Sequence, residues 1–436
     1  MQNLRIKEKV KIIVLFAVIS SITASFAYLP SYIIPNIQIN SANLDGLKLS
    51  AGEISFQPEI KKIVGDFPYW VHVGDVNNDG MNDIIVANRH HDVVTILLWN
   101  STINDWDPRF NISAGYNPMC VVIEDANNDG YNDIITCNYF FNTISILIWN
   151  SGVTDWEPIT TKPVGIDPFR IYVADINNDG YNDLISADQH SDSITMYLWN
   201  NFAQDWNPQD TRLVGSRPVN VFIGDANNDG YNDVIVLNRD HDSITVFLSL
   251  GSTLGSPFTL AVGDQSYGLF IGDINNDGMN DIVTTSFNDN TITILLWNPV
   301  AEYWNLGITK NVGVGPLGVS IGDVNNDGNN EIVIAIKEQD LISILTWNDN
   351  KVDWDHINKE VGDNPNQVYI ADANNDNIND IVVTNYDEGS VSIFLGIESR
   401  PVISGYESNL IIIGTILGFV IIILKKVKIL KYKSTI

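Results

Sequence analysis

The sequence has little cysteine and little positive charge, and each shortage excludes a class of protein. Its two cysteines, Cys120 and Cys137, exclude a disulfide-rich scaffold and a zinc site built on cysteine. One disulfide or two free, buried thiols would both fit this pair. The 24 Lys and Arg residues are outnumbered by 53 Asp and Glu residues, which gives a net charge of −29. Because phosphate binding needs clustered basic side chains, nucleic acid is not an expected partner.

The sequence also lacks the motifs of common enzyme sites. It contains no paired nucleophile and base, no glycine-rich phosphate loop and no clustered zinc spacing. A hydrophobic content of 44% is enough for a large core and excludes a disordered chain. We therefore expect a folded protein that is not an enzyme.

The charge is divided unevenly along the chain. Residues 1–11 hold four basic residues and one acid, and residues 425–436 hold five lysines and no acid. The middle of the chain keeps 15 basic and 52 acidic residues, a net charge of −37. So many carboxylates on one domain suggest bound cations.

The two ends have the patterns of targeting segments. Residues 1–27 combine a basic start, an apolar run and small residues before Ala27, which predicts a secretory signal peptide. The alternative is an uncleaved anchor. Residues 410–424 form an uncharged run that is mostly apolar, and we predict a transmembrane helix over residues 409–425, with a buried core helix as the alternative. Residues 426–436 would then be a basic cytoplasmic tail, which leaves the middle of the chain outside the cell.

A nine-residue phrase, D-x-N-N-D-[GN]-x-N-[DE], recurs seven times at intervals of 48 to 50 residues. Its copies begin at Asp75, Asp125, Asp175, Asp225, Asp273, Asp323 and Asp372. An apolar, alternating stretch precedes each copy, and further apolar runs follow it. Four short β-runs per repeat, without helical periodicity, are typical of one propeller blade. We therefore predict an all-β, seven-bladed β-propeller over residues 54–396.

The ends of the repeat predict how the ring closes. The seventh copy stops after its third run, at residues 391–395, whereas an orphan run at residues 59–64 precedes the first copy. The orphan run would supply the missing outer strand of the last blade. Residues 28–53 and 397–408 are then linkers.

Alternate positions of the phrase have the spacing of a calcium loop. Positions 1, 3, 5 and 9 supply side-chain oxygens and position 7 a backbone carbonyl, which suits a hard ion that takes about six to eight oxygens. Without cations, 21 carboxylates in seven tight turns would repel one another. A polar turn without metal is the alternative structure, and magnesium is the alternative ion. The predicted ligands of up to seven Ca²⁺ ions are Asp75, Asn77, Asp79, Met81 and Asp83; Asp125, Asn127, Asp129, Tyr131 and Asp133; Asp175, Asn177, Asp179, Tyr181 and Asp183; Asp225, Asn227, Asp229, Tyr231 and Asp233; Asp273, Asn275, Asp277, Met279 and Asp281; Asp323, Asn325, Asp327, Asn329 and Glu331; and Asp372, Asn374, Asp376, Ile378 and Asp380.

An acidic phrase of the form D-x-N-x-D-G-x-x-D between two β-runs resembles the FG-GAP or VCBS repeat of integrin α-subunit propellers and many microbial surface proteins. The resemblance covers about 340 residues. It implies a seven-bladed propeller with calcium in the loops between the first and second strands, on what we call the lower face. Family members mostly bind proteins or glycans, often in adhesion, and some are attached to polysaccharide-cleaving enzymes.

The repeats disagree on the opposite, upper face. A surface that binds one asymmetric ligand needs a different residue from each blade, and aromatic and Arg side chains are common binding anchors. Drift of exposed turns without function is the alternative. The candidate ligand-binding residues are Trp70, Arg89, His90, His91, Phe140, Arg170, His190, Arg239 and His241.

Tryptophans recur in pairs seven residues apart, in five of the seven repeats. The pairs are Trp99 and Trp106, Trp149 and Trp156, Trp199 and Trp206, Trp297 and Trp304, and Trp347 and Trp354. Residues copied at one register usually build the fold, so we expect packing between blades rather than platforms for sugars.

These observations predict a calcium-binding adhesion or recognition module on the cell surface, held by a membrane anchor. Its partner would be an extracellular protein or glycan. Two alternatives remain open: an enzyme acting on extracellular polysaccharide, and a structural protein of a surface coat.

Overall fold

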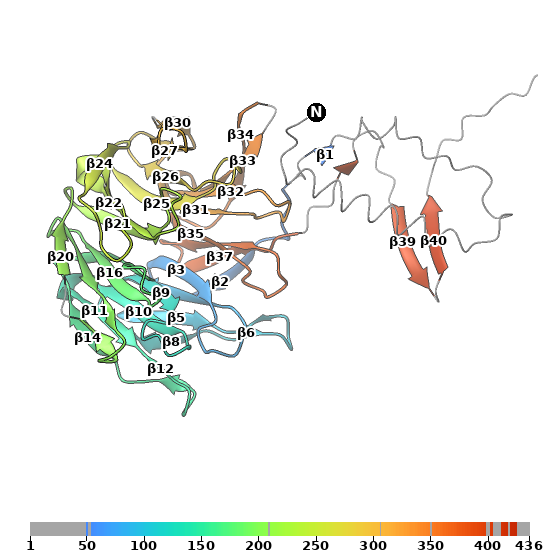
Figure 1. Ribbon diagram of the computed structural model, residues 1–436. Helices are drawn as coiled ribbons and strands as arrows, with labels where there is room; N and C mark the ends of the chain where they lie inside the picture. Colours follow the sequence, from blue (N-terminus) through green and yellow to red (C-terminus); the bar gives the residue numbers. More distant parts are fainter. Residues whose placement is uncertain are drawn as a thin grey trace, which may run out of the picture. The chain divides into compact units, whose positions relative to one another are not determined.

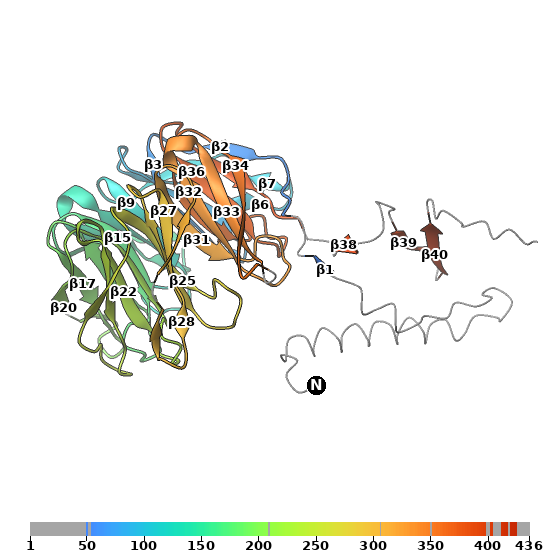
Figure 2. The same cartoon turned by 90° about the horizontal axis from the view of Figure 1, so that it is seen from above.

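The computed structural model describes residues 54–397, apart from 208–209, 306 and 349–350, and the backbone of four short strands outside this range. Contacts divide the chain into two units, Gly52–Arg400 and the two ends together. Within the first unit, seven four-stranded antiparallel sheets are arranged as blades around one axis (Figures 1 and 2). The predicted all-β, seven-bladed propeller is confirmed.

The first strand of each blade lies nearest the axis and contacts the first strands of both neighbouring blades. These strands are β3 (Pro68–Gly74), β9 (Pro118–Glu124), β15 (Pro168–Ala174), β21 (Pro218–Gly224), β25 (Ser266–Gly272), β31 (Pro316–Gly322) and β35 (Pro365–Ala371). Since β3 also contacts β35, the ring is closed.

The second strands are buried along their whole length, because both faces of each sheet are covered by neighbouring blades. They are β4 (Asp83–Asn88), β10 (Asp133–Asn138), β16 (Asp183–Asp188), β22 (Asp233–Asn238), β26 (Asp281–Ser286), β32 (Glu331–Ile336) and β36 (Asp380–Asn385). This burial explains their continuous runs of Ile and Val.

The third and fourth strands complete each blade toward the outside. The third strands are β5 (Val93–Leu97), β11 (Thr143–Leu147), β17 (Ser193–Tyr197), β23 (Ser243–Phe247), β27 (Thr291–Leu295), β33 (Leu341–Asn348) and β37 (Ser390–Phe394). The fourth are β8 (Phe110–Ser113), β14 (Thr160–Pro163), β20 (Asp210–Leu213), β24 (Phe258–Ala261), β30 (Ile308–Asn311), β34 (Asp353–Glu360) and β2 (Ile60–Ile63). Three turns between second and third strands form 3-10 helices: η2 (Tyr139–Phe141), η3 (Arg239–His241) and η4 (Lys337–Gln339).

The seventh blade is closed by the orphan strand, as the sequence predicts. Strand β2 pairs with β37 in antiparallel register, with Ile60 opposite Ile393 and Ile63 opposite Ser390. An isolated bridge between Phe56 and Gly396 extends the contact. The first and last parts of the propeller are therefore joined in one sheet.

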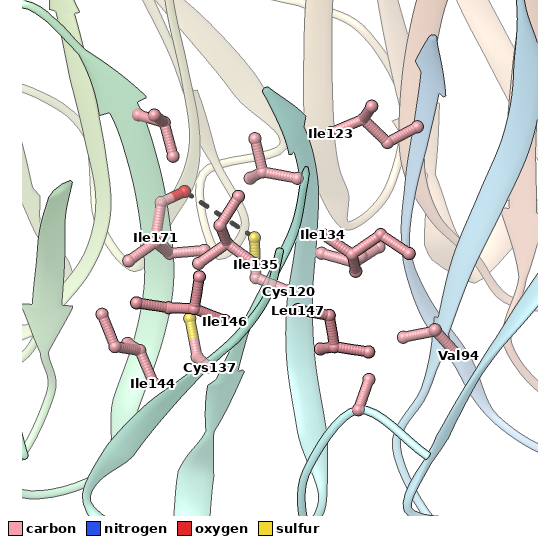
Figure 3. Packing of buried hydrophobic residues seen from close by; sticks show 14 of the residues in the cluster. Val94, Cys120, Ile123, Ile134, Ile135, Cys137, Ile144, Ile146, Leu147 and Ile171 are labelled. Atoms are coloured by element: carbon pink, nitrogen blue, oxygen red, sulfur yellow. Dashed lines mark hydrogen bonds between the residues drawn. The ribbon is translucent and has the colours of Figure 1, made fainter. Parts of the chain in front are cut away.

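The hydrophobic core lies between the blades. One cluster takes side chains from the first three blades and includes Val94, Ile135 and Ile171 (Figure 3). Cys120 and Cys137 are buried in this cluster as free thiols, which decides between the two alternatives of the sequence.

The tryptophan pairs also pack between blades, which confirms the structural interpretation. Short ladders join β6 (Trp99–Asn100) to β7 (Asp105–Trp106), β12 (Trp149–Asn150) to β13 (Asp155–Trp156), β18 (Trp199–Asn200) to β19 (Asp205–Trp206) and β28 (Trp297–Asn298) to β29 (Tyr303–Trp304). The Trp99 and Trp106 ring centroids lie 4.9 Å apart. Both rings are buried with Val382 and Val391 of the seventh blade.

The second unit differs from the sequence prediction. Strand β1 (Leu49–Ser50) pairs with β38 (Val402–Ile403), and β39 (Ile411–Ile416) pairs with β40 (Phe419–Leu424). The described part of the expected transmembrane helix, residues 409–425, is thus a pair of strands rich in β-branched Ile and Val, which favour extended backbone. No helix among the described residues is long and apolar enough to cross a membrane. The predicted signal peptide, residues 1–27, and the tail, residues 426–436, lie outside the described residues.

Ring closure should depend on strand β2. Deleting residues 54–65 would leave β37 as an unpaired edge, and such edges recruit other chains. We expect this variant to lose cooperative unfolding and to aggregate, as measured by circular dichroism melting and size-exclusion chromatography. The control exchanges Lys61 and Lys62 for Thr, which keeps a strand-forming sequence and should leave the protein monomeric. A deletion variant that melts like the parent would contradict this role of β2.

Candidate functional site

The loop between β3 and β4 illustrates how the repeated phrase folds. Asp75 accepts hydrogen bonds from the backbone N–H groups of Asp79 and Gly80, at 2.9 and 2.8 Å. The side-chain oxygen of Asn77 accepts the N–H of Asp79 at 3.0 Å, and Asp79 accepts the N–H of Met81 at 2.9 Å. The loop between β9 and β10 repeats these four bonds. The predicted ligand oxygens at positions 1, 3 and 5 therefore hold the turn together from inside.

Two positions of the loop need a left-handed backbone. The asparagine at position 4 has φ between 54° and 61° in all seven copies, and the glycine at position 6 has φ between 87° and 93° in six. A Cβ on any of those six glycines would meet nothing within 4 Å, so backbone conformation rather than crowding selects glycine. In the seventh copy Asn377 takes this position with φ of 67°. Asparagine is among the residues that tolerate this region best.

The acid at position 9 has a different environment from the other predicted ligands. Asp83 is fully buried, and its two oxygens accept the N–H groups of Val76 and Trp99 at 3.2 and 2.8 Å. It therefore ties the start of the loop to the end of the third strand. Burial raises the pKa of Asp83 to about 7, and repulsion from Asp79 and Asp75 adds to the shift.

The other six blades repeat this buried acid. Burial raises the pKa to about 7 for Asp133, Asp183, Asp281 and Asp380, to about 6 for Asp233 and to about 8 for Glu331. The five aspartates each accept at least two backbone N–H groups, whereas Glu331 accepts one, from Val324 at 3.1 Å. Among the described residues, no cationic side chain contributes to these pKa shifts.

The asparagines at positions 4 and 8, to which the sequence reasoning gave no role, join neighbouring blades. Asn132 donates from its side chain to the carbonyl of Asp75 in the preceding blade, at 2.9 Å. Its backbone N–H donates to the side-chain oxygen of Asn78 at 2.7 Å. The side-chain bond from position 8 to the carbonyl of position 1 occurs at all seven joints, including the one that closes the ring, from Asn82 to Asp372. The recurrence of Asn at positions 4 and 8 in all seven copies is the feature of the sequence from which this role could have been predicted.

The predicted ligand atoms of each loop are all oxygens, and oxygen is the ligand that a hard cation such as Ca²⁺ prefers. Each carboxylate oxygen of the first loop accepts one hydrogen bond and keeps a second lone pair. In the part of the chain that the structure describes, no three His, Cys, Asp or Glu side chains converge as a metal cluster. Calcium binding therefore stays a prediction.

The candidate residues of the upper face fall into two groups. Five lie on the turns between second and third strands: His90, His91, Phe140, His190 and His241. His91 and His190 each lie beside an acid, with nitrogen–oxygen distances of 3.2 Å to Asp66 and 2.6 Å to Asp167. Phe140 is 64% exposed. These five residues come from four consecutive blades, the first to the fourth.

The other four candidates, Trp70, Arg89, Arg170 and Arg239, lie on the axis or next to it. The guanidinium of Arg170 stacks on the ring of Trp70, 3.5 Å from its centroid, and both line an axial cavity of about 140 Å³. Arg89 lines a second cavity, of about 210 Å³, nearer the turns. Arg239 donates to Asp240 at 2.9 Å and to Tyr267 at 3.2 Å. The structure thus brings these side chains together where the sequence could only place them on one face.

Comparison with known proteins gives one family and several similar structures. The FG-GAP-like repeat family matches residues 75–136, 125–186, 175–236, 225–284 and 273–334. None of the curated proteins compared with the chain matches it.

Three solved structures have a similar fold. Kuenenia stuttgartiensis hydrazine synthase is 11% identical and has a TM-score of 0.53, over 77% of this chain and 97% of its own. A proposed 6-phosphogluconolactonase of Bacteroides fragilis is 14% identical, with a TM-score of 0.53 over 70% of this chain and 87% of its own. Another from Bacteroides uniformis is 13% identical, with a TM-score of 0.52 over 67% and 85%. At these identities the likeness concerns the fold alone.

The joints between loops predict a specific loss of stability. Replacing Asn82 with Ala removes the bond to the carbonyl of Asp372, at 2.8 Å, and leaves that carbonyl without its partner. We expect the free energy of unfolding to fall by about 1–3 kcal/mol, measured by urea denaturation with and without calcium. The control is Met81→Ala, which truncates the adjacent, 37% exposed side chain. An equal loss in both variants would contradict a role specific to Asn82.

Proposed function

Because the chain belongs to the FG-GAP-like repeat family, we propose that it is a recognition module that acts outside the cell, as a calcium-stabilised propeller with its ligand on the upper face. The observation that carries this proposal is the contrast between the two faces. The seven lower loops repeat one phrase almost without change, whereas the residue that follows the second strand is of five different types in the seven blades. The seven residues are Arg89, Tyr139, Gln189, Arg239, Phe287, Lys337 and Tyr386.

Three features support calcium in the lower loops. The donors are all oxygens, the turn is already organised by its own hydrogen bonds, and each loop places three carboxyl groups in nine residues. A divalent cation would offset the repulsion within each loop, including that felt by the buried acid at position 9. Asp75, Asn77, Asp79 and Asp83 with the carbonyl of Met81 would hold it in the first blade, and the corresponding residues in the others.

The proposed location outside the cell rests on the sequence of residues 1–27, which has the pattern of a secretory signal. Millimolar calcium in that compartment would keep weak sites filled.

Calcium should carry much of the stability of the propeller. With a Kd of about 10⁻⁴ M, typical of extracellular modules, millimolar calcium adds roughly 1.4 kcal/mol per site, and seven independent sites would add at most about 10 kcal/mol. We therefore expect chelation by EDTA to lower the melting temperature by many degrees, with recovery on adding calcium in excess.

A stoichiometry measurement controls for nonspecific effects of the chelator. The variant Asp79→Asn removes one carboxylate from the first loop and should bind one calcium ion fewer in isothermal titration calorimetry. A melting curve that EDTA leaves unchanged would contradict calcium binding.

Ligand binding should depend on the upper face. We expect a screen of the full-length chain on glycan and extracellular-protein arrays to find a ligand. The affinity for this ligand should fall by about tenfold or more when four residues are replaced with Ala: Arg89, His90, Phe140 and His190. The matched control replaces Asn104 and Asn201, in turns between third and fourth strands on the lower face. Binding that survives the upper set and is lost with the lower set would contradict the assignment.

A further inference from the structure

The cavity at the upper end of the axis, which we call the axial mouth, has an unusual composition for so acidic a protein. The cavity of about 210 Å³ at the upper end is lined by Arg89 and Lys337 together with Tyr69, Tyr267, Phe287 and Tyr386. No Asp or Glu lines it. Residues 54–397 contain 13 Lys and Arg residues, and two of them line this one cavity.

These cations lack partners of opposite charge. Within the described part of the chain, no ion pair involves Arg89 or Lys337. Arg89 is oriented by rings instead: its guanidinium carbon lies 5.8 Å from the centroid of Tyr69 and 5.9 Å from that of Tyr139. Its Nε is buried without a hydrogen-bond partner. A buried guanidinium donor without an acceptor is costly, and a bound anion would remove that cost.

The inner axial cavity, of about 140 Å³, also contains an arginine. Arg170 lies on the ring of Trp70 and donates to the sulfur of Cys120 at 3.1 Å, while its Nε also has no partner. The one acid that lines this inner cavity, Glu124, is the last residue of β9 and so lies toward the lower face. The positive charge is therefore concentrated at the upper end of the axis.

One acid of the upper face, Asp240, is already paired with other cations. Asp240 accepts ion pairs from both Arg239, at 2.9 Å, and Arg217, at 3.2 Å. This leaves Arg89 and Lys337 as the available cations of the mouth.

We propose that the axial mouth binds the carboxylate of an acidic sugar, a hexuronic acid, with Arg89 and Lys337 holding the carboxylate and the aromatic rings packing on the sugar ring. This inference rests on the proposed function and names its ligand class. Arg pairs with carboxylates in a bidentate geometry, and binding sites generally combine an apolar lining with a few placed polar groups. Tyr69, Tyr267 and Phe287 supply the apolar lining, and Tyr386 adds a fourth ring. A cavity of this size suits one sugar ring or a small acid rather than a folded protein surface.

The test uses isothermal titration calorimetry on the full-length, calcium-loaded chain. The probes are free D-glucuronate and D-galacturonate, a trigalacturonate that carries the same group at the end of a glycan, and neutral glucose and galactose. We expect the uronates to bind and the neutral sugars to bind at least about tenfold more weakly, because one charge-assisted contact is worth about that factor. Tighter binding of trigalacturonate than of the free acids would identify a polysaccharide end as the source, and equal affinity a free acid. Added salt should weaken all uronate binding.

Matched variants locate the site. Arg89→Gln and Lys337→Gln should each weaken uronate binding by about tenfold. Arg212→Gln should not, because Arg212 lies on the outer strand β20 and is paired with Asp210. The melting temperature of each variant in calcium shows whether the propeller is folded.

The outcomes separate this inference from the proposed function. Equal binding of neutral sugars and uronates, or full uronate binding by Arg89→Gln and Lys337→Gln, would overturn the acidic-sugar site. An upper-face ligand that is neutral would still satisfy the proposed function. Binding of an oligoglutamate peptide in place of uronates, with the same sensitivity to Arg89→Gln, would overturn the ligand class and leave a site for acidic peptides.

Discussion

Hydrogen bonds donated by the asparagine at position 8 of each acidic loop connect each blade of this propeller to the preceding one. At every joint, the side chain of position 8 donates to the carbonyl of position 1 in the preceding blade. Without this bond, the backbone carbonyl of position 1 would lose its hydrogen-bond partner. A buried backbone carbonyl without a partner is costly. The joint also fixes the spacing of the first strands around the axis. Because the same contact must form seven times, the phrase that makes it has little freedom to change.

The same phrase concentrates negative charge at one end of the molecule. Its acids at positions 1 and 5 organise the turn, and its acid at position 9 is buried under the loop, where backbone N–H groups are its hydrogen-bond donors. Folding therefore places many carboxylates close together. Cations bound in the loops would complement this arrangement, so that the joints, the turns and the proposed calcium sites belong to one physical unit.

The opposite end of the axis is less constrained in sequence. At six blade boundaries an Asp or Asn at the end of the turn between second and third strands accepts a backbone N–H of the next blade, whereas the other residues of these turns vary from blade to blade. There the chain gathers Arg89, Lys337 and several aromatic rings around a cavity, although the protein as a whole is strongly acidic. One end of the propeller thus carries the repeated architecture, and the other end has the chemical asymmetry that recognition requires.

The sequence by itself determined the number of blades, the closing role of residues 59–64 and the face that carries the acidic loops. These features follow from short-range patterns: the interval of about 50 residues, the alternation of apolar residues and the positions of Asp, Asn and Gly within nine residues. The tertiary structure alone decided which groups meet across longer distances. The partners Asn78 and Asn132 are 54 residues apart in the sequence, and the stacking of Arg170 on Trp70 joins the third blade to the first. It also decided that Cys120 and Cys137 remain thiols and that residues 411–416 and 419–424 are strands rather than one helix. An apolar run of this kind, rich in Ile and Val, is compatible with either structure, and its pairing partner, not its hydropathy, selects between them.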